Sequence, residues 1–332
     1  MIDFVLFGAG RIGKLHARNL AENPRSRIAY VYDPVREAAE ALASQYGAKV
    51  ARTPEEALAD TAVKAALIAS STNTHVDLML ASARAGKAVL CEKPIDLDIK
   101  RVNACVEELK KHPVAVAIGF NRRFDPTNQA LKKALDAGEV GDIHQVIITS
   151  RDPEGPPPEY IKVSGGKFRD MTIHDFDMAR WLLPEEPVEV FATGSCLIYP
   201  EVRKLGDIDT SMVVLRTKSG VLCHINNSRR AVYGYDQRME VFGSKGMIRT
   251  ENHHNTNLRR TTDRHVEAKD LLLNFFLERY AQAYVNELND FLDAVEGRTK
   301  APMIGPEDGR RALILADAAL ESSRTGRVVK IA

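Results

Sequence analysis

The first third of the chain alternates short apolar runs with stretches of helical periodicity. Apolar or β-branched runs, which predict buried strands, lie at residues 2–6, 28–32, 65–69 and 88–91. Helices are predicted between them over residues 11–21, 36–46 and 74–86. Another begins at Thr53-Pro54-Glu55-Glu56, where the threonine hydroxyl can cap the first turn and Glu56 can reach back as a capping box. This strand–helix order predicts a parallel sheet with crossover helices.

The pattern changes after about residue 142, where apolar runs follow one another with few helices between them. They lie at residues 143–148, 188–192 and 211–215, a succession that predicts a mainly antiparallel sheet. A long helix with a core-facing stripe is predicted near the end of the chain. The stripe consists of Phe276, Tyr280, Tyr284, Leu288, Phe291 and Val295. We therefore predict an α/β Rossmann domain over residues 1–120 and an α+β domain with a large, mainly antiparallel open sheet over residues 121–332.

Length and charge narrow the functional class. A chain of 332 residues suggests about two domains. Its 46 basic and 45 acidic residues give a net charge of +1, so no large positive excess is available to bind nucleic acid or an anionic membrane surface. No run approaches the roughly 18 apolar residues that a membrane-spanning helix needs. A small neutral or mildly charged ligand fits this composition better.

The cysteines are few and widely spaced. Cys91, Cys105, Cys196 and Cys223 form no C-x-x-C pair. The N-terminus lacks the basic region and long apolar segment of a secretion signal. We expect a cytoplasmic protein with reduced thiols.

A glycine motif stands between the first predicted strand and the first predicted helix. Gly8, Gly10 and Gly13 form G-x-G-x-x-G, which supplies a tight turn, a backbone bare enough to approach a pyrophosphate, and a helix N-terminus directed at its charge. Asp33 follows Gly13 by 20 residues, where a carboxylate can accept hydrogen bonds from the adenosine ribose. The pattern favours dinucleotide binding over a merely structural turn, and NAD over NADP. Arg36 is close enough in sequence to keep NADP open.

Further polar residues follow the next two strands of the predicted sheet, at the edge where such sheets bind ligands. Residues 69–75 supply hydroxyls and an amide for a cofactor; alternatively, Thr74 caps the next helix and His75 lies at the surface. In Glu92-Lys93-Pro94, the proline restricts the backbone of Lys93 and so directs its ammonium group. The predicted cofactor-binding residues are Gly8, Gly10, Arg11, Ile12, Gly13, Asp33, Ser70, Thr72, Asn73, His75, Glu92 and Lys93.

A second candidate motif lies in the α+β half. Gly165-Gly166 precedes Asp170 and His174, which are four residues apart and would share one face of a helix. A carboxylate at that spacing can hold an imidazole in place for proton transfer. We therefore predict catalytic roles for Lys93, Asp170 and His174.

Together these motifs resemble the Gfo/Idh/MocA oxidoreductase family, and the resemblance covers nearly the whole chain. It rests on G-x-G-x-x-G at residues 8–13, on Glu92-Lys93-Pro94, and on Gly165-Gly166 followed by Asp170 and His174. Within that family the chain looks most like the inositol 2-dehydrogenases. The segments that carry this finer likeness are residues 119–125, 170–177, 233–236 and 278 onward.

The resemblance implies NAD-dependent oxidation of myo-inositol at its axial hydroxyl to the 2-keto product, scyllo-inosose. His174 would be the base, Asp170 would orient it, and Lys93 would stabilise the oxygen and relay protons. A cis peptide between Lys93 and Pro94 is also implied. The residues expected to bind ring hydroxyls are Arg122, Asp152 and Tyr235. The family further implies a homo-oligomer, often a tetramer, in which the open sheet supplies the subunit interface.

Other functions remain open from the residues alone. A related enzyme could act on another inositol isomer or on an aldose, and Arg122-Arg123 and Arg229-Arg230 leave a phosphorylated sugar possible. A non-catalytic NAD-binding sensor would be expected to lack one of the three catalytic residues. A metal-dependent hydrolase could use His253, His254 and His265, but they lie in a polar segment without ligand spacing, so we expect no metal.

Overall fold

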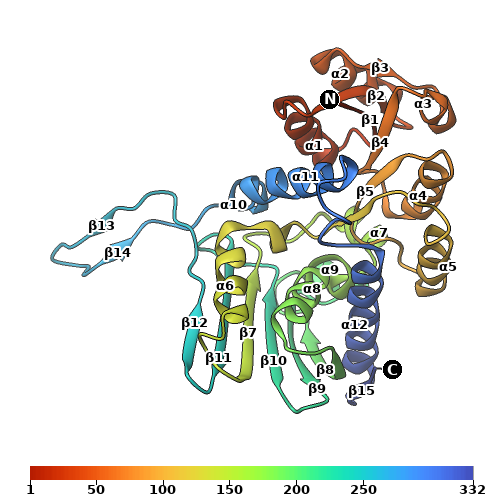
Figure 1. Ribbon diagram of the computed structural model, residues 1–332. Helices are drawn as coiled ribbons and strands as arrows, with labels where there is room; N and C mark the ends of the chain where they lie inside the picture. Colours follow the sequence, from red (N-terminus) through yellow and green to blue (C-terminus); the bar gives the residue numbers. More distant parts are fainter. Residues whose placement is uncertain (332) are drawn as a thin grey trace. The chain divides into compact units, whose positions relative to one another are not determined.

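The computed structural model describes residues 1–331, which form two compact units (Figure 1). The first unit comprises Met1–Asn121 and Gln282–Leu313. The second comprises Arg122–Ala281 and the chain from Ile314 onward. The chain therefore passes from one unit to the other three times.

The first unit contains one parallel sheet with the strand order β3-β2-β1-β4-β5-β6. Its strands are β1 Ile2–Phe7, β2 Ser26–Tyr32, β3 Lys49–Val50, β4 Val63–Ile68, β5 Ala88–Glu92 and β6 Val116–Gly119. Its helices are α1 Arg11–Glu22, α2 Arg36–Tyr46, α3 Pro54–Ala59, the 3-10 turn η1 Thr72–Thr74, α4 His75–Arg84 and α5 Ile99–Leu109, together with most of α11 Ala281–Val295 and the start of α12 Pro306–Thr325. This is the predicted Rossmann architecture.

Local signals explain where these helices begin and end. Thr53 Oγ1 accepts a hydrogen bond from the Glu56 amide at 3.3 Å, as the capping motif predicts. Glu56 Oε2 reaches back to the amide of Arg52, one residue before the expected partner, at 2.7 Å. Gly47 ends α2 in the left-handed conformation, with φ of 65°, which glycine adopts without steric cost.

The second unit is built around a seven-stranded sheet with the order β12-β11-β7-β10-β9-β8-β15. β7 and β10 pair in parallel, and every other neighbouring pair in this sheet is antiparallel within residues 1–331. The strands are β7 Ile143–Arg151, β8 Pro187–Ser195, β9 Thr210–Thr217, β10 Leu222–Ser228, β11 Asp236–Gly243, β12 Gly246–Arg249 and β15 Val329–Lys330. The mainly antiparallel sheet predicted for this half is confirmed.

Helices and a hairpin complete the second unit. The helical segments are η2 Asn121–Phe124, α6 Pro126–Asp136, α7 Pro158–Ser164, the π-helical turn η3 Phe168–Thr172, α8 Ile173–Leu182, α9 Pro200–Lys204 and α10 Phe276–Arg279, together with the end of α12. The strands β13 Arg259–Arg260 and β14 Ala268–Lys269 form a hairpin that extends away from the sheet (Figure 1).

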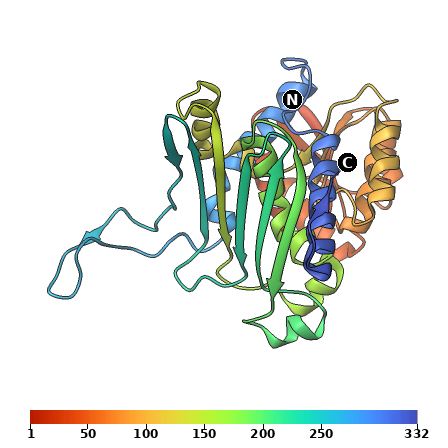
Figure 2. The same cartoon turned by 90° about the horizontal axis from the view of Figure 1, so that it is seen from below.

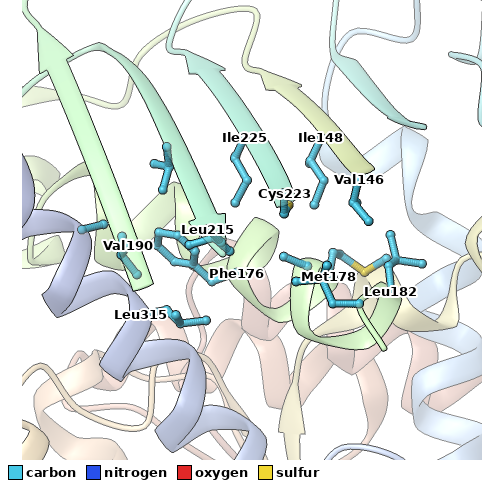
Figure 3. Packing of buried hydrophobic residues seen from close by; sticks show 14 of the residues in the cluster. Val146, Ile148, Phe176, Met178, Leu182, Val190, Leu215, Cys223, Ile225 and Leu315 are labelled. Carbon is cyan, nitrogen blue, oxygen red and sulfur yellow. The ribbon is translucent and has the colours of Figure 1, made fainter. Parts of the chain in front are cut away.

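One face of the seven-stranded sheet carries the core of the second unit. Val146, Leu215 and Ile225 project from this face, and Phe176 of α8 and Leu315 of α12 pack against it (Figure 3). The sheet is seen with the helices on one side in Figure 2. Successive strand residues point to opposite faces, so every second residue of these strands lies on the other face of the sheet, which is exposed. Large apolar side chains exposed there are Phe191, Met212, Val214, Leu222, Phe242 and Met247.

The two units differ from the predicted division at residue 120 because the C-terminal part of the chain contributes to both. Residues 282–313, expected in the second domain, belong to the first unit, where Leu288, Phe291 and Leu292 complete the core that contains Phe4. The rings of Phe4 and Phe291 lie 6.1 Å apart. An apolar stripe predicts burial, but it does not specify the sheet on which the helix packs.

The long helix predicted from residues 276–295 is wrong in one respect, because it is divided into α10 and α11 at Tyr280. Tyr280 leaves the helical conformation, with φ of −111° and ψ of 17°. The preceding Arg279 is held in the second unit by a buried ion pair with Asp125, whose Oδ2 lies 2.5 Å from Arg279 Nη1. The break therefore occurs where the chain leaves one unit for the other.

Candidate active site

The glycine motif forms a close turn between β1 and α1. A Cβ atom on Gly13 would lie 2.0 Å from the carbonyl oxygen of Gly8, and one on Gly8 would lie 2.5 Å from that of Ala69. A Cβ on Gly10 would meet no protein atom within 4 Å. Gly8 and Gly13 are thus required by packing, whereas Gly10 leaves its surroundings clear at the N-terminus of α1. This arrangement fits a pyrophosphate, which needs a bare backbone and a helix N-terminus.

Asp33 follows β2 and organises the same turn. Its Oδ2 accepts a hydrogen bond from the amide of Ala9 at 2.7 Å, and its Oδ1 accepts one from Val35 at 2.8 Å. Beside it lies a cavity of about 240 Å³ that is lined by Tyr32, Asp33, Pro34, Arg36, Val50, Ala51 and Arg52. A carboxylate beside this cavity suits an adenosine ribose. The same lining contains two arginines, so the charge around Asp33 is mixed.

The loop after β4 contains a pair of hydroxyl side chains and a buried histidine. Ser70 and Thr74 are joined through their hydroxyls at 2.7 Å. His75, which the sequence left as either a surface or a cofactor residue, is buried, and burial lowers its pKa. Its Nδ1 lies 2.8 Å from the carbonyl of Pro94 and its Nε2 lies 3.1 Å from that of Ser70. The neutral ring carries a single N–H and so donates to only one of these two carbonyls, and a contact between His75 and the cofactor stays a prediction.

Glu92 and Lys93 end β5 at the same edge of the sheet. The Lys93–Pro94 peptide bond is cis, as the resemblance implied. Glu92 Oε1 lies 2.9 Å from Nε2 of the buried His16, and its Oε2 accepts a hydrogen bond from the Lys93 amide at 3.3 Å. His16 was not singled out from the sequence, although its position three residues after Gly13 places it on the first turns of α1.

In the second unit, Asp170 and His174 lie on consecutive elements instead of one regular helix. Asp170 belongs to the π-helical turn η3, and His174 is the second residue of α8. Such turns occur often at functional sites. Asp170 accepts hydrogen bonds from the hydroxyl of Tyr160 at 2.9 Å and from Nη2 of Arg229 at 3.2 Å. The orientation of His174 by Asp170 stays a prediction.

Arg122 and Tyr235, predicted to bind substrate, lie together in a buried polar cluster. Arg122 Nη1 is 2.6 Å from Asp175 Oδ1, and Nη2 donates to the Tyr235 hydroxyl at 3.4 Å. Asn227 Nδ2 donates to Asp175 Oδ2 at 2.8 Å. Arg122 is 4 % exposed and Tyr235 is 5 % exposed, so both serve first as internal partners. Asp175 was missed as a functional residue, although it adjoins His174.

Asp152 lies beyond the end of β7 in a strongly charged environment. Burial raises its pKa to about 6, although Arg229 and Lys167 act in the opposite direction. Burial lowers the pKa of Lys167 to about 7, and the nearby Arg229 cation acts in the same direction. Lys167 is fully buried, and its Nζ donates to Met171 Sδ at 3.4 Å. No signal in the sequence marked Lys167 as a buried lysine.

The three histidines considered for a metal site do not gather around one. Within residues 1–331, no group of three His, Cys, Asp or Glu side chains could hold a metal ion. His254 Nδ1 instead lies 2.7 Å from the carbonyl of Asp270, at the base of the β13–β14 hairpin. No helix among the same residues is long and apolar enough to cross a membrane.

Known proteins resemble this chain over its full length. Residues 2–120 match the oxidoreductase family with an NAD-binding Rossmann fold, and residues 128–249 match the GFO/IDH/MocA C-terminal domain. The inositol 2-dehydrogenase of Rhizobium meliloti is 48% identical, over 100% of this chain and 99% of its own. The myo-inositol 2-dehydrogenase of Thermotoga maritima is also 48% identical, over 98% and 97%. The structure of Lactobacillus casei myo-inositol dehydrogenase in complex with NAD(H) and myo-inositol matches with a TM-score of 0.90 at 26% identity, over 100% and 97% of the two chains.

Proposed function

Because the chain belongs to the Gfo/Idh/MocA oxidoreductase family, we propose that it oxidises myo-inositol to the 2-keto product with NAD as the hydride acceptor. The chain is an NAD-dependent oxidoreductase. The observation that carries the choice of substrate is the full-length likeness, at 48% identity, to two enzymes named for inositol. Asp170, His174 and Lys93 are all present, which argues against a sensor that has lost its catalytic residues.

The first unit offers what NAD requires. The space beside Gly10 admits a pyrophosphate at the N-terminus of α1, and Asp33 lies at the cavity that suits the adenosine end. Bound NAD supplies a nicotinamide that accepts a hydride. Asp33, as a carboxylate, disfavours the extra phosphate of NADP.

Proton transfer is assigned to the three predicted catalytic residues. His174 accepts the proton of the reacting hydroxyl, and Asp170 orients its imidazole. The ammonium group of Lys93 stabilises the developing negative charge on that oxygen. The Tyr160 and Arg229 contacts fix the Asp170 carboxylate, so that it can act as a rigid partner.

Substrate hydroxyls are assigned to Asp152, Arg122 and Tyr235. Asp152 is the best supported, because its carboxylate lies among the cations of Arg229 and Lys167 and burial raises its pKa. Arg122 and Tyr235 are engaged with each other and with Asp175, so they act by shaping the pocket as well as by any direct contact. Neutral hydroxyls suit a site in which arginines are paired with carboxylates.

The test is steady-state turnover of myo-inositol with NAD, beside a panel of other inositols, aldoses and sugar phosphates. His174→Ala and Lys93→Ala should each lose about 10²–10⁴-fold in kcat. Both should still bind NAD in a fluorescence titration. His265→Ala and Lys162→Ala, at exposed positions, serve as matched controls. Near-normal turnover in His174→Ala would remove it from the mechanism, and an enzyme that ignores myo-inositol but oxidises an aldose would overturn the substrate alone.

We also propose that the chain assembles into a homotetramer through the open sheet face. Phe242, Met212 and Met247, each about half exposed, lie on this face with three more large apolar residues. A sheet face with several large exposed apolar side chains is typical of a surface that another copy covers. Light scattering after size-exclusion chromatography should give four times the mass of the chain, and Phe242→Glu should give smaller species. A monomeric wild-type protein would refute the assembly.

A cytoplasmic location and a role in inositol breakdown complete the proposal. The four cysteines are unpaired with one another within residues 1–331, which fits a reducing compartment. Deletion of the gene should abolish growth on myo-inositol as the carbon source, and the activity should be recovered in the cytosolic fraction. Normal growth, or activity confined to another fraction, would contradict this role.

A further inference from the structure

Polar side chains are buried between α1 and α11, inside the first unit. His16 and Asn19 project from α1 and Glu287 from α11, and all three are between 2 % and 4 % exposed. Four of their atoms lack a hydrogen-bond partner among residues 1–331: His16 Nδ1, Asn19 Nδ2, and both carboxyl oxygens of Glu287. Buried polar atoms are nearly always hydrogen-bonded, so four in one place require an explanation.

The two helices bring these groups together. The ring of Tyr284 packs edge-on against the imidazole of His16, with centroids 5.6 Å apart. Glu287 lies three residues further along α11, on the same face of the helix as Tyr284. Further along the contact, Asn23 Nδ2 donates to Asn289 Oδ1 at 2.9 Å. Glu287 therefore belongs to the face of α11 that covers His16.

His16 connects this contact to the end of β5. Its Nε2 lies 2.9 Å from Glu92 Oε1, and Glu92 Oε2 accepts the amide of Lys93. A carboxylate partner requires a proton on Nε2, so a neutral imidazole presents its lone pair at Nδ1. His16 Nδ1 then needs a donor, and the nearby donors are Asn19 and a protonated Glu287.

Glu287 is expected to be such a donor. Burial raises its pKa well above the ordinary value, and the carboxylates of Glu92 and Asp290 act in the same direction. An ionised carboxylate here would be buried without a cation, which is strongly unfavourable. The other titratable groups beside Glu92 are His16, the adjacent Lys93, and His75, on whose pKa Glu92 acts.

We propose that Glu287 is a positioning residue which, as a neutral carboxylic acid, holds His16 in the Nε2–H tautomer through a buried water molecule. One water can accept hydrogen bonds from Glu287 and Asn19 and donate one to His16 Nδ1. These three bonds are within the two to four that a buried water makes. His16 then donates to Glu92 and fixes the carboxylate that accepts the Lys93 amide. Glu287 thus acts on Lys93 through His16 and Glu92, and this role rests on the catalytic function proposed above for Lys93.

The variants separate a positioning role from simple packing. In Glu287→Gln the amide keeps a donor and no charge, so activity should stay within a few-fold of wild type. In Glu287→Leu the donor is lost, and kcat should fall by up to roughly 10²-fold, the loss expected from a small misplacement of reacting groups. The KM for myo-inositol and the NAD affinity should change little. Glu296→Gln, which removes an exposed carboxylate that pairs with Arg25, is the matched control.

A double-mutant cycle with His16→Gln tests the path of the effect. If Glu287 acts through His16, Glu287→Leu should cause no further loss of kcat in the His16→Gln background. Losses that multiply would show that the two residues act independently and would overturn the proposal. So would equal losses in Glu287→Gln and Glu287→Leu.

Infrared spectroscopy provides a readout that does not depend on turnover. At neutral pH the difference spectrum of wild type minus Glu287→Gln should show the carbonyl band of a protonated carboxylic acid, which moves in D₂O, whereas the difference of wild type minus Glu296→Gln should lack it. Absence of that band from the wild type would refute a neutral Glu287 whatever the substrate is. A band that is present in an enzyme unable to oxidise inositols would instead contradict the proposed function while leaving Glu287 neutral.

Discussion

Replacing Asp175 by asparagine should strongly destabilise the second unit. The change removes the anion beside the Arg122 guanidinium, which lies 2.6 Å from Asp175 Oδ1. The side chains of Arg122 and Asp175 are 5% and 0% exposed, so water cannot replace the lost partner. Breaking one partner of a buried ion pair leaves an uncompensated charge, which typically costs about 3–5 kcal/mol.

The contacts of Asp175 support the same magnitude. Its carboxylate accepts one hydrogen bond from Arg122 and one from Asn227 Nδ2, at 2.6 and 2.8 Å. Each hydrogen bond to a charged group contributes roughly 1.5–3 kcal/mol, so the two together give about 3–6 kcal/mol. The asparagine oxygen can keep one of the two contacts, which favours the lower half of that range. The exposed pair Arg216–Glu189 should contribute only about 0–1 kcal/mol, so Glu189→Gln is the control.

Urea unfolding followed by tryptophan fluorescence measures the free energy of unfolding of the second unit. Trp181, the only tryptophan, lies on α8 with Asp175 and therefore reports on the second unit. The free energy of unfolding should fall by about 3–5 kcal/mol in Asp175→Asn. The double variant Arg122→Met/Asp175→Leu should recover part of it, because no charge is left buried. A loss below about 1 kcal/mol in Asp175→Asn would refute the view that this pair is a desolvated unit.

Two further predictions concern the carboxylates assigned to the cofactor and to the substrate, Asp33 and Asp152. Asp33→Ser should weaken the preference for NAD over NADP, measured as the ratio of kcat/KM values, because it removes a negative charge beside Arg36 and Arg52; wild-type protein that prefers NADP would contradict this. Burial raises the pKa of Asp152 to about 6, so the carboxylate becomes protonated as the pH falls through that value and the KM for myo-inositol should rise. Asp152→Asn should have a higher KM with no such rise, and an unchanged wild-type KM from pH 8 to 5 would exclude Asp152 from binding.

Local patterns were sufficient to predict the nucleotide-binding half of the fold. Gly13 is constrained by its close approach to Gly8 in the turn, Gly8 is constrained by the carbonyl of Ala69 after β4, and Asp33 accepts the amide of Ala9 in the same turn. Most of these constraints lie within one strand–helix–strand unit, so the spacing of residue types along the chain records them. The cis bond at Lys93 was inferred from the family resemblance and is present in the structure.

The partners of buried charges could not be predicted in the same way. Arg122 and Asp175 are 53 positions apart. From the residues next to each of them in sequence, both would be expected at the surface. Lys167 immediately precedes the η3 turn and is fully buried, which no periodicity indicates. His16 and Glu287 meet because α11 packs on the first unit, a choice that the apolar stripe leaves open.

The return of residues 282–313 to the first unit has a consequence for biosynthesis. Leu288, Phe291 and Leu292 lie in the core that surrounds Phe4, although nearly three hundred residues separate the two ends of the chain. The ribosome synthesises β6 long before α11. Until α11 is made, the apolar surface that it covers in the first unit stays exposed. Because chains grow at about 5–20 residues per second, the delay is on the order of ten seconds or more. During that interval the sheet lacks the helix that covers this apolar surface, so expression of residues 1–120 alone should yield an aggregation-prone fragment.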